Sequence, residues 1–461
     1  MVIIAVLHLH CSLYQNTYNP PDISSIHLHP RFMIKALFSF SRKLQTIAAF
    51  SLISLSQALN AADWTQYRGP DYNGATSETI NTSKLMGKAS WKVDTPNGFS
   101  SFAVANGIAA TLISREDQDG LIREACLAVD AKSGKSLWRI DLGRAEYGHD
   151  GGNAGAKGNT GGDGPRSTPT ISDGKIYVYD ADLNLYAFDA KSGKPLWKKR
   201  IEKDFDGRQI KWKNATSPII DGNLVIVAGG GAGQTFLAFN KSSGDLVWKS
   251  GDTTLTHATP TIANIHGVRQ VIFFMTSGLV GVDISSGKIL WEQSHPFKVS
   301  TAASPIVDGE YIYCSAGYGV GGGLYKVSKS GSKFSSKNVW FKKDVVNHWS
   351  TPVLHNGHIY GMFGFKKYGN GPLKCIELAT GNEKWSTDGF GPGNVTLTGD
   401  GKLLALGDDG SLVVAEATPT SYKEIARAKV VSGKCWSTPT LAYGHIFARS
   451  TKEAICLNVS H

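Results

Sequence analysis

The sequence predicts an all-β protein, an eight-bladed β-propeller with four antiparallel strands per blade and an N-terminal strand that closes the last blade. Three observations predict this fold. An acidic residue or Asn stands eight positions before a Trp, and a Gly four positions before it, in five segments that end at Trp138, Trp197, Trp248, Trp291 and Trp385. Ser/Thr-Pro pairs recur every 42 to 49 residues between Pro169 and Pro352. Gly is abundant, at 52 of 461 residues, and no long Ala/Glu/Leu/Lys run indicates a helix. Repeats of this length, with short strands and tight turns, are typical of propellers.

The unit from 167 to 201 shows how one repeat forms a blade. Asp173–Gly174 and Ser192–Gly193 predict tight turns, because Gly readily adopts the positive φ that such turns need. Pro169 fits the first residue of a strand, where its missing N–H breaks no ladder bond. The predicted strands begin at Pro169 and then cover 175–180, 185–190 and 195–201.

The number of first strands gives the number of blades. Six begin with Ser/Thr-Pro, at Pro169, Pro218, Pro260, Pro305, Pro352 and Pro439. Residues 100–113 supply another, and residues 395–417 fill the 87-residue gap before Pro439 as a blade that has lost the repeated Pro, Gly and Trp. The final unit, 437–460, has only three strands, so residues 89–95, which contain Trp91, are expected to supply its fourth.

The repeated Trp residues are predicted to be structural. On an outer strand each indole can lie across the next blade, while the acidic residue and the Gly fix the turn beside it. Burial of such a ring makes Trp→Ala cost roughly 3–5 kcal/mol. The docking residues predicted in this way are Trp91, Trp138, Trp197, Trp248, Trp291, Trp340 and Trp385.

The N-terminus is predicted to be a secretory signal. Lys35, Arg42 and Lys43 precede an apolar stretch at 44–55, which small residues follow; this order is that of a signal peptide. We therefore divide the chain into an upstream segment plus signal peptide at 1–62, with a start at Met33, an arm at 63–90 and the propeller at 91–461. An anchor that begins at Met1 is disfavoured, because polar residues interrupt the apolar run. The expected location is the periplasm or beyond, with no transmembrane span in the mature chain.

Charge and cysteines exclude several classes. The net charge is +10, and beyond residue 62 the chain has 44 Lys and Arg against 37 Asp and Glu, which leaves +7. No dense Lys/Arg run occurs, so nucleic acid is not an expected partner, whereas an anionic small molecule or an acidic surface is. Five cysteines follow the leader without a C-x-x-C pair, so they are expected to be apolar filler, and C-x-x-C-H haem attachment is excluded.

The A-x-D-x-x-x-G-x-x-x-W pattern, as in Ala128/Asp130/Gly134/Trp138 and Ala187/Asp189/Gly193/Trp197, resembles the tryptophan-docking motif of PQQ-like eight-bladed propellers. That superfamily contains quinoprotein alcohol dehydrogenases and BamB-like exported assembly scaffolds. The resemblance covers residues 91–460 and implies the fold more than the chemistry. The chain lacks the adjacent Cys–Cys pair typical of the dehydrogenases, and it lacks the lipid-acceptor Cys of BamB.

The loops that lead into the first strands converge on one mouth of the central channel, where we expect a binding rim for an anionic ligand. Cations and aromatic rings at a concave mouth are a usual ligand environment. The alternative is that these are ordinary loop residues, with Trp349 and Trp436 packing between blades. The rim residues predicted are Arg166, Lys211, Trp212, Lys213, Asn214, His257, Asn347, His348, Trp349, Lys434 and Trp436.

The Gly-rich loop at 143–164 lies beside this rim, and the sequence leaves open whether it is a lid or disordered. Its Arg144, Glu146, His149, Asp150 and Asp163 could reach over the mouth. The "DADLN" segment at 180–184 resembles the start of a calcium loop, but Leu185 and the residues after it do not complete one. No metal site is predicted.

These observations favour an exported binding or assembly scaffold over an enzyme, with no cofactor and a monomeric state. The expected partner is an unidentified protein or an anionic small molecule at the channel mouth. The alternative is a PQQ-dependent dehydrogenase that uses Ca²⁺ and acts on alcohols or sugars. It is disfavoured because the loops into the first strands carry no Asp or Glu to hold the metal. No catalytic residue is assigned.

Overall fold

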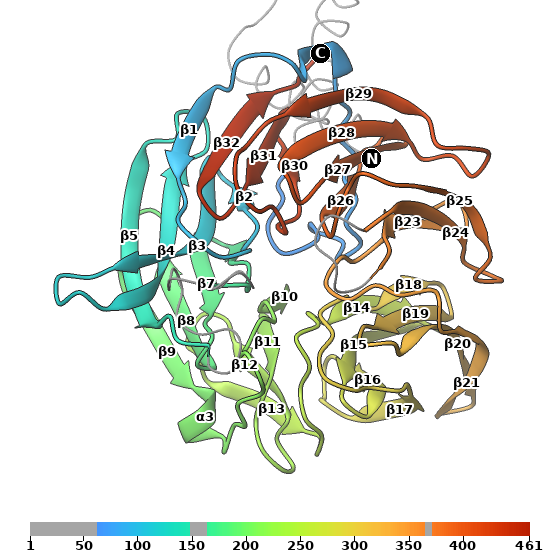
Figure 1. Cartoon of the computed structure of the whole chain (residues 1–461). Helices are drawn as coiled ribbons and strands as arrows, with labels where there is room; N and C mark the ends of the chain where they lie inside the picture. Colours follow the sequence, from blue (N-terminus) through green and yellow to red (C-terminus); the bar gives the residue numbers. More distant parts are fainter. Residues whose placement is uncertain (1–61, 148–163, 365–370) are drawn as a thin grey trace, which may run out of the picture. The chain divides into compact units, whose positions relative to one another are not determined.

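The computed structural model describes residues 62–147, 164–364 and 371–461. Asn60–His461 form one compact unit, distinct from Met1–Leu59, so the predicted leader lies outside the described residues. The described part contains eight four-stranded sheets. Figure 1 shows these sheets arranged as blades around a common centre. The predicted eight-bladed propeller is confirmed.

Seven blades are continuous in sequence and run from the innermost to the outermost strand. Blades 1 to 3 contain β2 (Ala103–Ala105), β3 (Ile108–Glu116), β4 (Ile122–Asp130) and β5 (Ser136–Arg144), then β6 (Thr170–Ser172), β7 (Lys175–Tyr179), β8 (Asn184–Asp189) and β9 (Pro195–Arg200), then β10 (Ile219–Asp221), β11 (Leu224–Ala228), β12 (Phe236–Asn240) and β13 (Leu246–Ser250). Blades 4 and 5 contain β14 (Thr261–Ile265), β15 (Val268–Met275), β16 (Gly278–Asp283) and β17 (Ile289–Ser294), then β18 (Ile306–Asp308), β19 (Tyr311–Ala316), β20 (Gly321–Ser330) and β21 (Lys333–Lys342). Blades 6 and 7 contain β22 (Val353–His355), β23 (His358–Met362), β24 (Leu373–Glu377) and β25 (Glu383–Thr387), then β26 (Asn394–Leu397), β27 (Lys402–Leu406), β28 (Ser411–Glu416) and β29 (Glu424–Lys429).

Blade 8 joins the two ends of the propeller. It contains β30 (Thr440–Ala442), β31 (His445–Arg449), β32 (Glu453–Asn458) and, as its outermost strand, β1 (Trp91–Asp94). β1 pairs antiparallel with β32, with Trp91 opposite Cys456 and Asp94 opposite Glu453. The predicted closure by an N-terminal strand is thus confirmed. The described helices are short: η1 (Thr82–Lys84) is a 3₁₀ turn, and α3 (Ile201–Asp204) is a single turn that follows β9.

The Trp residues dock as the sequence predicts, from one blade onto the turn of the next. Gly134, Gly193, Gly244, Gly287 and Gly381 all have positive φ, and a Cβ added to any of them would meet the docked indole at 2.6–3.1 Å. Only Gly allows this close approach. Trp91, Trp138, Trp197, Trp248 and Trp340 donate from Nε1, over 2.9–3.2 Å, to the carbonyls of Ala131, Ala190, Lys241, Ile284 and Leu378. Trp385 reaches Thr418 in the same way, over 2.8 Å.

Trp291 is the exception among the seven predicted docking residues. It is buried, but its Nε1 donates to Oε1 of Gln270 in its own blade, over 2.7 Å. The next blade has no Gly turn to receive it, because β20 and β21 form a long hairpin in place of that turn. Trp291 is thus buried in a cluster with residues of blade 5 but lacks the contact with a Gly turn.

A ring of Ser and Thr side chains links the innermost strands, and the sequence analysis missed it. The backbone N–H of Ser101 donates to Oγ1 of Thr168, and that of Thr168 donates to Oγ of Ser217. Ser217 N–H donates in turn to Oγ1 of Thr259, and Thr438 N–H donates to Oγ of Ser101. Each bond lies between 2.8 and 3.0 Å and crosses from one blade to its neighbour. The hydroxyl before the Pro is thus an interblade acceptor, which gives a reason for the repeated Ser/Thr-Pro.

The arm at 63–90 crosses the channel and ties together blades that are far apart in sequence. Trp64 bridges Val104 in blade 1, and Ala75 bridges Leu397 in blade 7. Arg68 is buried, with a 3% exposed side chain, and its guanidinium donates to the carbonyls of Thr351 and Pro352 in blade 6 at 3.1 and 2.9 Å. In Figure 1 the blue arm runs across the middle of the ring.

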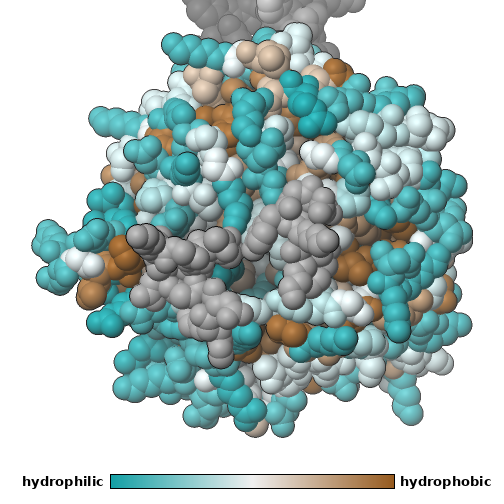
Figure 2. Space-filling view, viewed as in Figure 1, coloured by the Kyte–Doolittle hydropathy of each residue, from teal (hydrophilic) through white to brown (hydrophobic). Residues whose placement is uncertain are grey.

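The face in Figure 2 is mostly hydrophilic, and the five cysteines of the described residues are buried. Hydrophilic residues cover most of the face in Figure 2, and hydrophobic ones are scattered among them. Cys126, Cys314, Cys375, Cys435 and Cys456 are free and buried, as expected of apolar filler. Across residues 62–147, 164–364 and 371–461, no helix is long and apolar enough to cross a bilayer.

Candidate functional site

The two mouths of the channel are built from different parts of the blades. We call the end where the chain enters each innermost strand the first-strand mouth, and the predicted binding residues around it the rim. We call the opposite end, which carries the turns between first and second strands, the hairpin mouth. The structure gathers most of the rim residues into two groups, one beside blade 7 and one beside blade 3.

The first group is a stack of aromatic rings. The rings of Trp349 and Trp436 stack with their centroids 4.6 Å apart at 30°. Phe99 stacks on the other side of Trp436, at 4.4 Å and 28°. The ammonium of Lys434 lies 4.8 Å from the centroid of the Trp436 ring. Three rings from three blades and one cation thus share one part of the rim, and Phe99 was not predicted.

Blade 7 explains why these indoles meet. Its innermost strand follows a Gly-rich segment without Trp or Lys, so the Trp residues of blades 6 and 8 extend over it. Trp349 Nε1 donates to the carbonyl of Pro392 over 2.9 Å, and Asn394 Nδ2 donates to the carbonyl of Trp436 over 2.5 Å. The degenerate seventh blade therefore leaves space for the stack.

The second group joins Arg166, Lys211 and Trp212. Arg166 Nη1 donates to the carbonyl of Trp212 over 3.0 Å, and its guanidinium lies 4.7 Å from the ring centroid of Tyr147. The ammonium of Lys211 lies 4.6 Å from the centroid of the Trp212 ring. Trp212 has a φ of +64°, a left-handed conformation that costs energy for a bulky residue. Each cation of this group lies over an aromatic ring.

The two rim histidines are neutral at pH 7. Burial and the nearby Arg166 guanidinium lower the pKa of His257 to about 4. Its Nδ1 is 2.9 Å from Ser300 Oγ, and its Nε2 is 3.0 Å from the carbonyl of Lys211. Burial and the nearby His257 lower the pKa of His348 to about 3. The positive charge of the rim therefore comes from Lys and Arg alone.

Three predicted rim residues serve the fold instead. Asn214 is buried and donates to the carbonyls of Asp180 and Thr216 at 3.1 and 3.2 Å. Asn347 is buried too, accepting from Tyr313 OH at 2.7 Å and donating to the carbonyl of Met362 at 2.9 Å. The ammonium of Lys213 pairs with the Asp182 carboxylate.

Carboxylates lie close to the rim, which the sequence analysis did not foresee. Glu124 is buried at the start of β4, where Oε1 accepts from Tyr147 OH at 2.7 Å and Oε2 accepts from Ala181 N–H at 3.0 Å. Burial, reinforced by the Asp180 carboxylate, raises the pKa of Glu124 to about 7. Burial also raises the pKa of Asp180 to about 6. A Glu inside an apolar strand pattern, "REACLA", was the signal available for Glu124.

These carboxylates do not fit the Ca²⁺ that a PQQ enzyme requires. Oδ1 of Asp180 accepts from the Asn184 backbone at 2.8 Å, and Oδ2 accepts from Tyr186 OH at 3.1 Å, so both oxygens point into the turn at 180–184. Among the described residues, no three His, Cys, Asp or Glu side chains are arranged to hold a metal ion. The oxygens of Glu124 and Asp180 already accept hydrogen bonds from N–H and O–H groups of the protein.

Part of the Gly-rich loop can be placed. Arg144 and Glu146 form an ion pair at 3.7 Å, at the end of β5. The predictions for His149, Asp150 and Asp163 fall outside the described residues. Lid and disorder therefore remain alternative predictions for this loop.

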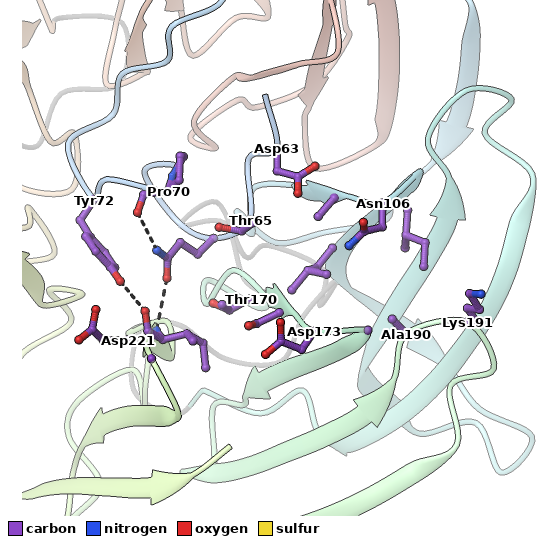
Figure 3. A pocket seen from close by; sticks show the side chains of 18 of the residues that line it. Asp63, Thr65, Pro70, Tyr72, Asn106, Thr170, Asp173, Ala190, Lys191 and Asp221 are labelled. Atoms are coloured by element: carbon purple, nitrogen blue, oxygen red, sulfur yellow. Dashed lines mark hydrogen bonds between the residues drawn. The ribbon is translucent and has the colours of Figure 1, made fainter. Parts of the chain in front are cut away.

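A pocket of about 950 Å³ lies at the hairpin mouth, between the arm and the turns of blades 1 to 3. Three of its five charged lining residues are in ion pairs: Arg269 Nε donates to Asp221 at 2.9 Å, and Asp173 pairs with Lys241 at 2.6 Å. Figure 3 shows Tyr72 and Pro70 of the arm on one side and the blade turns on the other, with Tyr72 OH bonded to a carbonyl of blade 3. With Asp63, Asp173 and Asp221 against Lys191 and Arg269 in its lining, this pocket is a poor anion site.

Comparisons with known proteins agree with this architecture. The sequence profile of the family described as "Outer membrane protein assembly factor BamB" matches residues 123–387, more than half of the chain. BamB of Shewanella oneidensis is 27% identical over 265 residues, which cover 54% of this chain and 62% of that protein. The tetrathionate hydrolase of Acidithiobacillus ferrooxidans is 25% identical over 266 residues, which cover 57% and 44%. The chain spans about half the length of the curated relatives it matches.

Solved structures show the same fold. The quinohemoprotein alcohol dehydrogenase of Comamonas testosteroni superposes with a TM-score of 0.60 at 14% identity, covering 87% of this chain and 82% of that one. At this identity the likeness concerns the fold alone. The profile match, the docking-motif repeats and the eight closed blades together show that the chain belongs to the BamB-like family of PQQ-like repeat propellers.

Proposed function

We propose that this protein is an exported binding or assembly propeller that holds a carboxylate-bearing ligand, or an acidic segment of a partner protein, at the rim. One observation carries the proposal. Arg166, Lys211 and Lys434 each lie within 4.6–4.8 Å of an aromatic ring centroid at the first-strand mouth. Such cation–ring contacts are worth about 0.5–1 kcal/mol when exposed and hold the charge in place for an anion.

The aromatic stack adds a preference for a flat or apolar group. Trp349, Trp436 and Phe99 are only partly buried, so one more ring could contact this part of the rim. Aromatic pairs contribute about 0.5–1.5 kcal/mol beyond their buried area. A ligand that combines carboxylates with a planar or apolar group matches both groups of the rim.

The two mouths differ in access. The arm crosses the channel at the hairpin mouth, where Arg68, Trp64 and Ala75 contact blades 6, 1 and 7. The rim lies at the other end. A partner would therefore approach at the rim, while the arm braces the opposite side.

The name shared by several relatives supports the assembly part of the proposal. BamB of Shewanella oneidensis and of Yersinia pestis are both named outer membrane protein assembly factors. Together with the predicted signal peptide, this supports a proposed site of action in the periplasm or beyond. A rigid ring with binding loops suffices for such a role.

The alternative, a PQQ-dependent oxidoreductase acting on alcohols or sugars, has weaker support. The fold likeness to quinoprotein dehydrogenases does not extend to the donor set, since the carboxylates beside the rim are turned toward backbone and phenol donors. The protein can be mixed with PQQ and Ca²⁺ and freed of unbound quinone. Stoichiometric quinone with dye-linked oxidation of an alcohol would contradict the scaffold proposal.

Calorimetric titration with benzene-1,3,5-tricarboxylate tests the rim directly. The double variant K211Q/K434Q should weaken binding at least about tenfold, because two cation contacts are lost. The matched control K203Q/K423Q removes two exposed lysines on α3 and beside β29 and should stay within about twofold. Absence of binding by the unmodified protein, or equal affinity of the two variants, would contradict the proposal.

A further inference from the structure

Blade 5 differs from its neighbours in the length of one hairpin. Its third and fourth strands, β20 and β21, have 10 residues each, whereas those of blades 2, 3, 4, 6 and 7 have five or six. β19 pairs with β20 only as far as Lys326, and the N–H of Val327 still donates to the carbonyl of Glu310, so Ser328–Ser330 pair with β21 alone. At about 3.3 Å per residue, this two-stranded end extends roughly 10 Å beyond the end of β19.

The hairpin contacts blade 4 in a different way from the other repeats: Val327 is buried in one hydrophobic cluster with Trp291, and Phe334 packs against that cluster. In blades 1, 2, 3, 4 and 6 a Gly turn at this position receives the Trp of the preceding blade. Here Gly331 and Ser332 connect the strands, and Trp291 bonds to Gln270 in its own blade instead. The hairpin therefore replaces the Trp–Gly contact with packing of its own and adds an exposed end.

The hairpin is strongly basic. Residues 321–343 contain six lysines and no Asp or Glu. Lys326 and Lys337 stand directly opposite each other in the strand register, an arrangement of like charges that destabilises a sheet. Glu310, in the turn before β19, pairs with Lys326 at 2.8 Å. Lys329, Lys333 and Lys337 are exposed: Lys333 and Lys337 lie on one face of the hairpin, whereas Lys329, opposite Phe334, lies on the other, with its ammonium 3.4 Å from the carbonyl of His266.

The base of the projection is held firmly. His266, in the first turn of blade 4, contacts the carbonyl of Val327 with Nε2 at 2.9 Å and Glu310 at 3.5 Å. Ser336 Oγ donates to the carbonyl of Glu292 on β17 over 2.7 Å. The ring of Phe334 lies 6.4 Å from that of His266. The lysines are thus presented on a fixed ribbon that extends past its blade.

We propose that the end of the β20–β21 hairpin docks the propeller on an anionic bilayer surface. The ammonium groups of Lys329, Lys333 and Lys337 are compact charges without the planar fork that recognises a single carboxylate. A layer of anionic headgroups meets such charges at any spacing, and each lysine near it raises partitioning about fivefold. A ribbon with a Ser-Gly-Ser tip offers no groove for a peptide, which favours a bilayer over an acidic protein segment.

Vesicle co-sedimentation of the full chain tests the proposal. Vesicles of 30% phosphatidylglycerol in phosphatidylcholine should bind the protein, whereas pure phosphatidylcholine should not. Binding should weaken as NaCl rises from 50 to 300 mM, because salt screens exposed charges. The variant K329Q/K333Q/K337Q should lower the partition coefficient at least about tenfold.

A matched variant controls for net charge. K132Q/K135Q/K194Q removes three exposed lysines from the corresponding turns of blades 1 and 2 and should change partitioning less than about threefold. Equal loss in both variants would assign binding to overall charge and overturn the proposal. The proposal also fails if the hairpin variant binds vesicles normally but self-associates. That result would mean that the lysines prevent edge-to-edge pairing of the hairpin with another chain. Binding to poly-L-glutamate without binding to vesicles would overturn it in favour of an acidic protein.

Discussion

The indole of Trp91 donates a hydrogen bond of 2.9 Å to the carbonyl of Ala131 and lies against Gly134, joining the last blade to the first. Trp91 is 7% exposed. The same contact recurs between other neighbouring blades. Here, however, Trp91 belongs to blade 8, whose other three strands come from the C-terminal end of the chain. The stability of the ring therefore depends on the repeated Trp–Gly contact and on the long-range pairing of β1 with β32.

Gly134→Ala should destabilise the protein more than Gly174→Ala. Both positions have positive φ, +71° and +69°, so both variants share the backbone cost. Only at Gly134 would the new Cβ meet the Trp91 ring, at 2.7 Å; at Gly174 nothing lies within 4 Å. We expect an extra loss of about 1–3 kcal/mol in the free energy of unfolding, measured with urea. Equal losses would show that the indole does not need the close approach.

Thr168→Val should cost about 1–3 kcal/mol, because it leaves the buried N–H of Ser101 without its acceptor. Thr168→Ser keeps the hydroxyl and should recover most of the stability. Thermal unfolding of the two variants measures the difference. If Val and Ser behaved alike, the ring of hydroxyls would contribute by packing only.

Arg68→Gln should loosen the arm. Its guanidinium donates to Thr351 and Pro352 from a buried position, and a shorter amide cannot reach both carbonyls. Burial lowers the pKa of Arg68 to about 10, so it is still charged at pH 7. We expect a loss on the order of 3 kcal/mol and faster proteolysis within 62–80. Arg115→Gln, at an exposed pair with Asp141, is the control and should change stability by less than about 1 kcal/mol.

The contribution of Glu124 to stability should fall as the pH rises from about 4.5 to 7, while His257 and His348, whose folded pKa values lie below the ordinary 6.5, contribute in the opposite sense. The folded pKa of Glu124 is about 7, above the ordinary value of 4.5, so the folded state binds this proton more tightly than the unfolded state. The contribution is present below pH 4.5 and lost by about pH 7, on the order of 2 kcal/mol. In urea titrations at several pH values, Glu124→Gln should remove this contribution, so that the free energy of unfolding rises more, or falls less, between pH 4.5 and 7 than in the unmodified protein. Glu116→Gln, at an exposed site, should leave the pH dependence unchanged; an unchanged pH dependence in Glu124→Gln would refute the assignment.

The strands of a blade were predictable because their signals are local. In the unit from 167 to 201 the predicted and observed strands agree within one residue, since the turns at Asp173–Gly174 and Ser192–Gly193 depend on residues two to four positions apart. The docking contacts were predictable for the same reason, because each Gly turn repeats at a fixed spacing. Trp291 shows the limit: its partner turn lies in the next blade, where the repeat is lost.

The sequence by itself determined the all-β class, the eight blades, the closing strand at Trp91 and the rim residues that follow one another at the first strands. Only the tertiary structure decided that Trp349 and Trp436 stack over a degenerate blade, that Asn214 and Asn347 face inward, and that Glu124 lies beside the rim. It also decided where the arm goes, since Arg68 meets Thr351, 283 residues away. The spacing of the repeats predicts contacts within a blade and between neighbouring blades. Contacts across the channel form only when the ring closes, and no local sequence pattern predicts them.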